Sequence, residues 1–128
     1  MRVAFQANNG QYVCAEGGGG REVVANRNEV GDWETFDLRV LPDGKAAMMA
    51  ANGQYLCAEA GGGRELVANR NEIGAWEEFD VRRLPNGKWA MMAANGQYVS
   101  AEGGGGRELV ANRNEIGDWE QFERREYP

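Results

Sequence analysis

One segment of this chain occurs three times at a constant spacing. The stretch NGQYVCAEGGGGREVVANRNEVGDWETF occupies residues 9–36, and close copies begin at Asn52 and Asn95, 43 residues apart. In a chain of 128 residues, three such periods leave no room for a separate catalytic domain. Repeats of this length first suggest solenoids or propellers, but three units are few for either. A closed threefold arrangement fits better.

The second copy predicts what each repeat forms. Strands are expected at residues 45–52, 54–60, 65–70 and 76–84 because apolar and polar positions alternate there. Asn-Gly at 52–53 is a strong hairpin signal, a glycine run follows the second strand, and Pro-Asn-Gly at 85–87 turns the chain into the next copy. The residues expected to face inward are Ala46, Met48 and Ala50 from the first strand, Leu56 and Ala58 from the second, and Phe79 and Val81 from the fourth.

The opposite face of the second strand carries Cys57, whose equivalents are Cys14 and Ser100. A serine at this position suggests a partly hydrated surface. Equivalent positions in a threefold object lie too far apart for a disulfide, so both cysteines are predicted to be free thiols. Free thiols and the lack of an apolar N-terminal leader slightly favour a cytoplasmic location, and a module excised from a secreted protein is the alternative.

Twelve strands with threefold symmetry describe a β-trefoil, in which six strands close a barrel and six form a hairpin cap. We therefore expect a single all-β domain over residues 1–128, with repeats at approximately 1–43, 44–86 and 87–128. The physical reason for repetition is shared burial. One pair of hairpins cannot bury its own apolar face, whereas three copies close the sheet and remove most of its edges.

Composition excludes several classes of function. The apolar fraction of 42% is typical of a folded protein. The net charge of −6 disfavours nucleic acids or other polyanions as partners. No apolar stretch is long enough for membrane insertion. The chain contains no histidine, no metal-ligand cluster and no pairing of a nucleophile with a base, so we expect neither catalysis nor a metal or cofactor.

The repeat resembles that of fascin-like β-trefoils. The matching motifs are G-x-Y-[LV]-x-A-E, V-A-N-R and G-x-W-E-x-F, and they occur in all three copies, so the resemblance covers nearly the whole chain. Eukaryotic fascins are tandem trefoils that bundle actin. Bacterial fascin-like modules are single trefoils, often beside glycoside hydrolases, where they look like carbohydrate-binding modules. The Q-x-W triplet of ricin-type lectins is absent.

The candidate binding residues are polar and aromatic groups that recur in each copy. Amide, guanidinium and carboxylate groups offer the donors and acceptors that sugar hydroxyls need, and an indole can stack on a sugar ring. These residues are Asn26, Arg27, Asn28, Glu29, Asp32 and Trp33 in the first copy, Asn69, Arg70, Asn71, Glu72 and Trp76 in the second, and Asn112, Arg113, Asn114, Glu115, Asp118 and Trp119 in the third.

Structural roles for the same residues remain open. Arg27 could pair with Glu34 to hold its loop, and the three tryptophans could anchor the junction of barrel and cap as part of the core. The glycine runs could serve only as turns, or could leave room for a flat ligand. Trp89, which has no aromatic equivalent in the other copies, is expected to fill extra core space.

The leading hypothesis is a non-catalytic carbohydrate-binding protein with up to three equivalent sites, whose partners are glycans or polysaccharide. Three weak sites on one rigid body would gain by avidity. If Asp32 and Asp118 contact ligand, the second copy should bind more weakly, because Ala75 stands there. The alternatives are a protein-binding scaffold of the fascin type that cross-links actin, and an engineered symmetric trefoil without ligand. The oligomeric state is open, with a monomer favoured.

Overall fold

The computed structural model describes residues 1–127, apart from the side chain of Ala60; Pro128, the last residue of the expected domain, lies outside the described residues. The strands are β1 (Arg2–Gln6), β2 (Tyr12–Ala15), β3 (Val23–Arg27), β4 (Phe36–Val40), β5 (Ala46–Met49), β6 (Tyr55–Ala58), β7 (Leu66–Arg70), β8 (Asp80–Arg83), β9 (Trp89–Met92), β10 (Tyr98–Ala101), β11 (Leu109–Arg113) and β12 (Glu123–Tyr127). Short 3-10 helices are η1 (Glu16–Gly18), η2 (Asp32–Glu34), η3 (Glu59–Gly61), η4 (Ala75–Glu77), η5 (Glu102–Gly104) and η6 (Asp118–Glu120).

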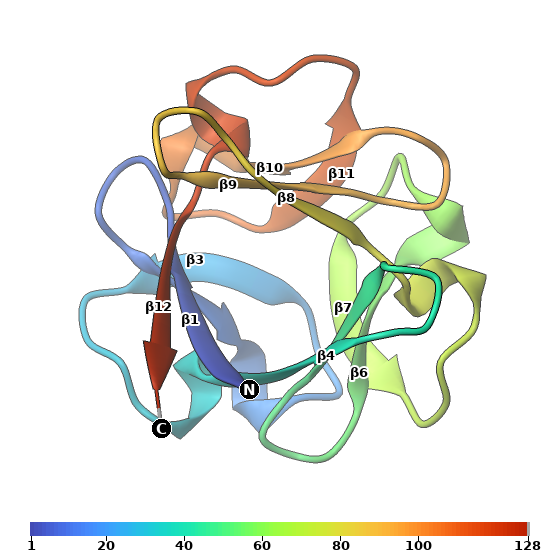
Figure 1. Ribbon diagram of the computed structural model, residues 1–128. Helices are drawn as coiled ribbons and strands as arrows, with labels where there is room; N and C mark the ends of the chain where they lie inside the picture. The colour runs from blue at the N-terminus through green and yellow to red at the C-terminus, as the bar shows by residue number, and fades with distance from the viewer. Residues whose placement is uncertain (128) are drawn as a thin grey trace.

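Six antiparallel strands close a barrel. β1 pairs with both β4 and β12, β4 pairs with β5, and β8 pairs with β9. Two single bridges complete the ring, because Ala46 meets Phe79 just before β8 and Trp89 meets Phe122 just before β12. The pairing of β1 with β12 brings the two ends of the described chain side by side (Figure 1).

The other six strands form three hairpins, β2–β3, β6–β7 and β10–β11, that cap the barrel. Bridges between hairpins close the cap around the pseudo-threefold axis: Glu22 with Val67, Glu65 with Val110, and Val24 with Glu108. Three similar lobes surround the centre in Figure 1. The expected twelve-stranded β-trefoil is confirmed.

The core is built from the same positions of each copy. Phe36, Phe79 and Phe122 are almost completely buried, and Phe5 packs edge to face against Phe122 with ring centroids 6.4 Å apart. Met48 and Met91 occupy the positions equivalent to Phe5, and both are buried as the alternation predicted. All of the expected inward residues of the second copy are buried except Val81, which packs partly buried against the core.

Two sequence expectations about tryptophan are wrong. The predicted strand 76–84 begins only at Asp80, because residues 75–77 form the 3-10 helix η4, which carries Trp76 outside the core. Trp89 does not fill core space either. Its ring is half-buried and lies under the guanidinium of Arg124, with the Arg124 Cζ atom 4.2 Å from the ring centroid.

Neighbouring copies are held together by an asparagine placed against a glycine. The backbone N–H of Asn52 donates to the carbonyl of Gly18 at 2.9 Å, and its side chain lies directly on Gly19. A Cβ atom added to Gly19 would lie 2.1 Å from the Asn52 Cγ atom, so only glycine fits. The same arrangement places Asn95 on Gly62 and Asn9 on Gly105, which closes the ring of copies. The glycine runs therefore accommodate a neighbouring asparagine at these positions, which leaves no room there for a flat ligand, the alternative that the sequence left open.

This contact predicts a large effect of one methyl group. Gly62→Ala is expected to lower the free energy of unfolding by about 3 kcal/mol, because Gly62 has φ +138° and its Cβ would overlap Asn95. Gly53→Ala is the control. Gly53 also has positive φ, but its Cβ would meet nothing within 4 Å, so about 1 kcal/mol is expected. Urea unfolding measures both, and equal losses would refute the contact.

Candidate functional site

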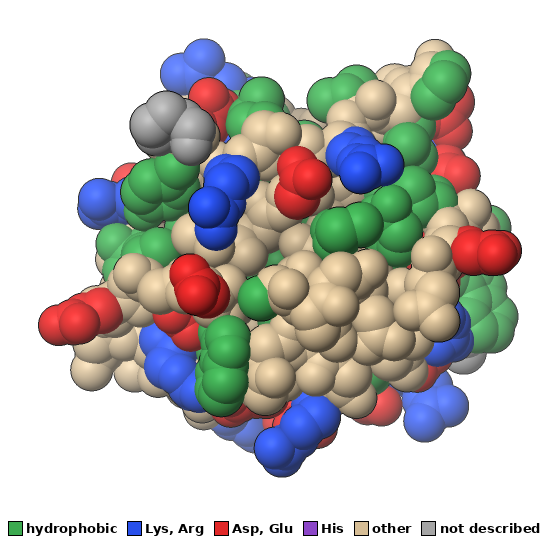
Figure 2. Space-filling model, turned by 90° about the horizontal axis from the view of Figure 1, so that it is seen from below, with side chains coloured by type: hydrophobic (Ala, Val, Ile, Leu, Met, Phe, Trp, Pro, Cys, Tyr) green, Lys and Arg blue, Asp and Glu red, His purple; other side chains and the backbone are tan. Residues whose placement is uncertain are grey.

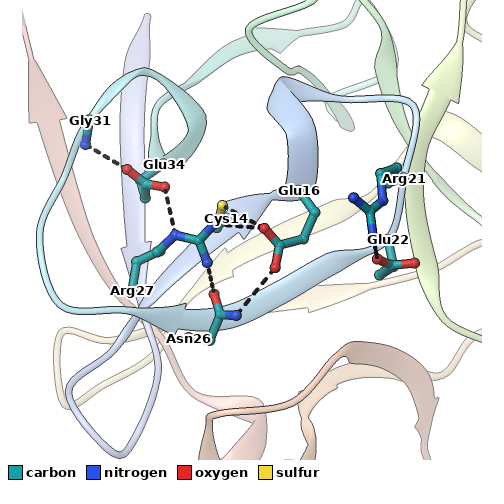
Figure 3. A network of polar contacts seen from close by, with 8 residues as sticks. All are labelled: Cys14, Glu16, Arg21, Glu22, Asn26, Arg27, Gly31 and Glu34. Carbon is teal, nitrogen blue, oxygen red and sulfur yellow. Dashed lines mark hydrogen bonds and ion pairs between the residues drawn. The ribbon is translucent and has the colours of Figure 1, made fainter.

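Each copy contains a partly buried cluster of polar side chains, here called the inner network. Figure 3 shows that of the first copy, in which Arg27 pairs with the carboxylates of Glu16 and Glu34. In the first copy Arg27 Nη2 donates to Glu16 Oε1 at 2.7 Å and Arg27 Nη1 donates to Asn26 Oδ1 at 2.7 Å. Asn26 Nδ2 donates to Glu16 Oε2 at 3.2 Å. Desolvation acts to raise the pKa of Glu16, but hydrogen bonds from Arg27 and Asn26 outweigh it and hold that pKa below its usual range.

A second carboxylate shapes the loop beyond β3. Glu34 is buried in η2, and its Oε1 accepts a hydrogen bond from the Gly31 backbone at 2.7 Å. Its other oxygen lies 3.9 Å from Arg27 Nε. Glu77 and Glu120 cap Gly74 and Gly117 in the same way, each at 2.6 Å. The expected pairing of Arg27 with Glu34 is thus present, although Glu16 is the closer partner.

The inner network therefore uses two of the predicted site residues of each copy for structure. Arg70 donates to Glu59 and Asn69 at 2.8 Å each, and Arg113 donates to Glu102 at 2.7 Å. These arginine side chains are only about one-third exposed, at 31–33% in the three copies. Asn26, Asn69 and Asn112 are half-buried beside them.

The cysteines lie inside this network. The partly hydrated surface predicted for them from the sequence is therefore wrong. Cys14, Cys57 and Ser100 are all fully buried, and both cysteines are free thiols, as predicted. Cys14 Sγ lies 3.8 Å from Glu16 Oε1 as a weak donor. Burial, together with the nearby carboxylate of Glu34, raises the pKa of the Cys14 thiol to about 12. Burial and Glu77 do the same for Cys57.

Replacing cysteine by serine alters the third network. Arg113 Nη1 donates to Ser100 Oγ at 3.4 Å, whereas its equivalents in the other copies donate to the neighbouring asparagine. As a result Asn112 Oδ1 is buried with no hydrogen-bond partner among residues 1–127. The serine fits because a hydrogen-bond donor reaches it, and the asparagine loses that donor.

The three tryptophans lie on the surface beside the inner network. Trp33, Trp76 and Trp119 are 42%, 43% and 40% exposed, so they do not belong to the core. The Arg27 guanidinium lies over the Trp33 ring, with Cζ 5.8 Å from its centroid. The Nε1 edge of Trp33 faces Gly18 so closely that a Cβ there would lie 3.0 Å from it. Arg70 and Arg113 lie over Trp76 and Trp119 in the same manner.

The remaining predicted residues are exposed, and together with the tryptophan of the same copy they are here called the rim. In the first copy the rim consists of Asn28, Glu29, Asp32 and Trp33, all exposed. Its counterparts are Asn71, Glu72 and Trp76 in the second copy, and Asn114, Glu115, Asp118 and Trp119 in the third. Gln11 Nε2 donates to Asn28 Oδ1 at 3.3 Å, and Gln54 and Gln97 hold Asn71 and Asn114 in the same way.

Shallow hollows lie beside two of the rims. One of about 490 Å³ is lined by Arg27, Asn28, Glu29, Val30, Gly31 and Glu34. The other, of about 390 Å³, is lined by Arg113, Gly117, Asp118, Trp119 and Glu120. Of the predicted residues, Arg27, Asn28 and Glu29 line the first hollow and Arg113, Asp118 and Trp119 line the second, whereas Asn26 and Asn112 line neither. The glutamines that hold the rim asparagines were not predicted, although they follow the Asn-Gly turn at the same place in each copy.

The sequence also gave no indication of the largest hollow, of about 640 Å³, which lies on the pseudo-threefold axis of the cap. Glu22, Glu65 and Glu108 line it together with Val24, Val67 and Val110. Arg21 lies beside Glu22 at 3.5 Å, and Arg64 and Arg107 pair with Glu65 and Glu108 at 3.8 and 3.7 Å. Only the closed ring of copies brings these residues together.

Residues 1–127 contain neither a cluster of metal ligands nor a membrane-spanning helix. No group of three or more His, Cys, Asp or Glu side chains is arranged to hold a metal ion. None of the described helices has the length and apolar character needed to cross a membrane. Lys or Arg and Asp or Glu side chains are interspersed over the face seen in Figure 2.

The comparison with family descriptions decides the relationship. Residues 9–124 match the Fascin domain. The chain belongs to the fascin domain family. The expectation drawn from the repeat motifs is therefore confirmed. Among curated protein sequences, none matches this one.

Solved structures share the fold at low sequence identity. The designed threefold-symmetric protein ThreeFoil superposes with a TM-score of 0.88 at 18% identity, over 98% of this fascin domain and 99% of ThreeFoil. SeviL bound to asialo-GM1 saccharide gives 0.77 at 13% identity, over 96% and 94% of the two chains. A mosquitocidal holotoxin gives 0.87 at 10% identity, with 99% of this chain matching 16% of the toxin. At such identities the similarity establishes the fold alone.

The altered network of the third copy predicts a stabilising substitution. Ser100→Cys should let Arg113 return to Asn112 and satisfy its buried oxygen, which raises the free energy of unfolding by about 1 kcal/mol. The mirror change Cys57→Ser is expected to lower it by a similar amount. Chemical denaturation of the two variants measures both signs, and an unchanged or lower stability for Ser100→Cys would contradict the interpretation.

The buried thiols predict a loss of stability in alkali. Each thiol keeps its proton up to about pH 12 in the folded protein but only to about 9.0 in the unfolded chain. The unfolded state therefore releases protons first, and stability falls as pH rises from about 9 to about 12. The double variant Cys14→Ser, Cys57→Ser should show a shallower decline. Denaturant unfolding inside and below this window compares them, and parallel declines would argue against buried neutral thiols.

Proposed function

We propose that this fascin domain is a non-catalytic carbohydrate-binding protein with up to three equivalent sites, one at each rim. The observation that carries the proposal is the exposure of Trp33, Trp76 and Trp119 at the same place in every copy. The same part of the indole is open to solvent in all three copies, and an aromatic ring can stack on a sugar ring. Each indole is held rigidly by an arginine and a glycine, so it offers a fixed apolar face to a ligand.

Polar groups beside each indole suit a hydroxylated ligand. Asn28 presents an amide, and Glu29 and Asp32 present carboxylates that can accept hydrogen bonds from sugar hydroxyls. The adjoining hollows are shallow and open, which suits the end or edge of a glycan chain. The structural similarity to SeviL, which was solved with a saccharide bound, is consistent with this proposal.

The threefold arrangement allows several weak sites to bind one surface at the same time. The rims sit on one rigid body, because each copy is hydrogen-bonded to the next around a closed ring. A surface that carries many copies of one glycan could engage two or three rims together, and avidity could raise the apparent affinity by about a hundredfold. The second rim, where Ala75 replaces the aspartate, is expected to be the weakest.

A second candidate function is protein binding of the fascin type, in which the domain cross-links actin filaments. The observation in its favour is the family match over residues 9–124. Co-sedimentation with filamentous actin tests it directly. Pelleting of the domain with actin, with bundles visible by electron microscopy, would favour this function over carbohydrate binding. Its absence from the pellet would reject it.

Truncation of the tryptophans tests the proposed sites. Screening on a glycan array first identifies a sugar, and titration calorimetry then compares Trp33→Ala, Trp76→Ala, Trp119→Ala and the triple variant. Each single change should weaken multivalent binding several-fold, and the triple change should abolish it, because the stacking face is lost. Stability should fall as well, since more than half of each indole is covered by the glycine and arginine beside it. Binding is therefore compared only among variants that still unfold cooperatively.

The control is Trp89→Phe, which changes a tryptophan outside the rims and keeps a ring under Arg124. It should leave glycan binding unchanged. The conservative variants Trp33→Phe and Trp119→Phe should retain part of the binding. If the triple alanine variant binds the glycan as well as the wild type does, the three tryptophans are not part of the binding site. A wild-type protein that binds no glycan on the array would refute the proposed function itself.

A further inference from the structure

The electrical charge of the rims restricts which glycans they can accept. Within each inner network the one cation is already neutralised. Arg27 lies 2.7 Å from Glu16 and also faces the buried Glu34, so two carboxylates surround one guanidinium. The guanidinium also donates to Asn26 and has one face against Trp33. Arg27 lines the hollow beside the rim, but its guanidinium already faces two carboxylates and so offers no unpaired charge to an acidic sugar.

The charges that remain at the rims are negative. Glu29 and Asp32 are exposed, and neither carboxylate forms an ion pair or accepts a hydrogen bond within residues 1–127. Glu115 and Asp118 are in the same situation in the third copy. Arg2 and Asp32 line a neighbouring hollow of about 300 Å³, but Arg2 Nη2 donates to Thr35 instead. The groups presented to solvent beside the indole are thus mainly acceptors.

This arrangement matches a positively charged donor. A carboxylate or sulfate on the ligand would meet two unpaired carboxylates at the first rim, which outnumber the single guanidinium of Arg2 in the neighbouring hollow. An ammonium group would satisfy the unpaired carboxylates and would also be attracted to the electron-rich face of an indole. A neutral sugar could donate hydroxyl hydrogen bonds but would leave the negative charges uncompensated.

We propose that the rims recognise glycans that carry free amino groups, such as glucosamine units, and that they reject glycans bearing carboxylate or sulfate. This inference rests on the proposed carbohydrate-binding function and names its ligand class. The rims of the first and third copies are the main sites for the amine, because each has an unpaired aspartate. The second copy offers only Glu72 beside Trp76, since Ala75 has no carboxylate.

The test is titration calorimetry with three short oligosaccharides of equal length: a glucosamine tetramer, its N-acetylated form and a galacturonate tetramer. The glucosamine tetramer should bind about fivefold more tightly than the N-acetylated one, as expected for one added surface ion pair. Added salt should reduce this difference, because exposed charges are screened. The galacturonate tetramer should show no binding.

Matched variants separate recognition at the rims from the overall negative charge. Asp32→Asn combined with Asp118→Asn removes two charges from the rims and should reduce the preference for the amine, while binding of the N-acetylated oligomer persists. Glu22→Gln combined with Glu108→Gln removes two charges from the axial hollow and should leave the preference intact. Ala75→Asp should increase the affinity for the glucosamine tetramer.

The outcomes distinguish the two proposals. Equal or tighter binding of the N-acetylated or galacturonate tetramer overturns the amine preference and leaves carbohydrate binding in place. An equal loss of preference in the axial control also overturns it, because net charge would then explain the effect. If none of the three oligosaccharides binds and the glycan array is also silent, the carbohydrate-binding function fails as well.

Discussion

The contact between an asparagine of one copy and a glycine of the preceding copy is the constraint on which the rest of the structure depends. Asn52 lies on Gly19, Asn95 lies on Gly62, and the ring closes when Asn9, from the start of the chain, lies on Gly105 near its end. No copy can make this contact alone. The Asn-Gly turn and the glycine run must therefore be present in every repeat, and the ring must contain all three.

The same contact positions the candidate sites. The glycine before each contact, Gly18 in the first copy, has the indole edge of Trp33 against it, so a side chain there would push the tryptophan away. The glutamine after each turn, Gln11 in the first copy, reaches across to Asn28 of the rim. One sequence element thus joins the copies, supports an indole and orients an amide. The rims are rigid because the ring is closed.

Much of this fold could be predicted from the sequence, because period-two alternation and turn signals report directly on strands. The position of Trp76 could not, since W-E-x-F reads as the start of a strand. In the structure Glu77 folds back to cap the Gly74 backbone and closes one helical turn. A single side-chain hydrogen bond overrides the alternation, and no pattern of apolar residues records it.

For the candidate site, the sequence located the segment but did not show which of its side chains are exposed and which are held in the inner network. Asn26 and Arg27 belong to the inner network, while Glu29 and Asp32 are exposed, although all four lie within seven residues. Each copy contains several carboxylates, and the sequence alone does not show which of them pairs with Arg27 or its equivalents. That assignment depends on the distance between β2 and β3, which brings Glu16 within 2.7 Å of the guanidinium. Burial of Cys57 was missed because a polar network, not an apolar layer, covers it.

Differences among the copies separate the demands of folding from those of binding. Some exposed positions differ among the copies: Val40, Arg83 and Glu126 are equivalent, and so are Arg2, Lys45 and Lys88. Others are the same in all three, as at Arg21, Arg64 and Arg107. Recent duplication would have left the differing positions identical as well. Identity within the inner network is required by its hydrogen bonds. Glu29, Glu72 and Glu115 have no such requirement, since their side chains are exposed and form no ion pair within the described chain, yet they are the same in all three copies. Contacts within the described chain do not account for that identity, and a ligand shared by the three rims is our proposed explanation.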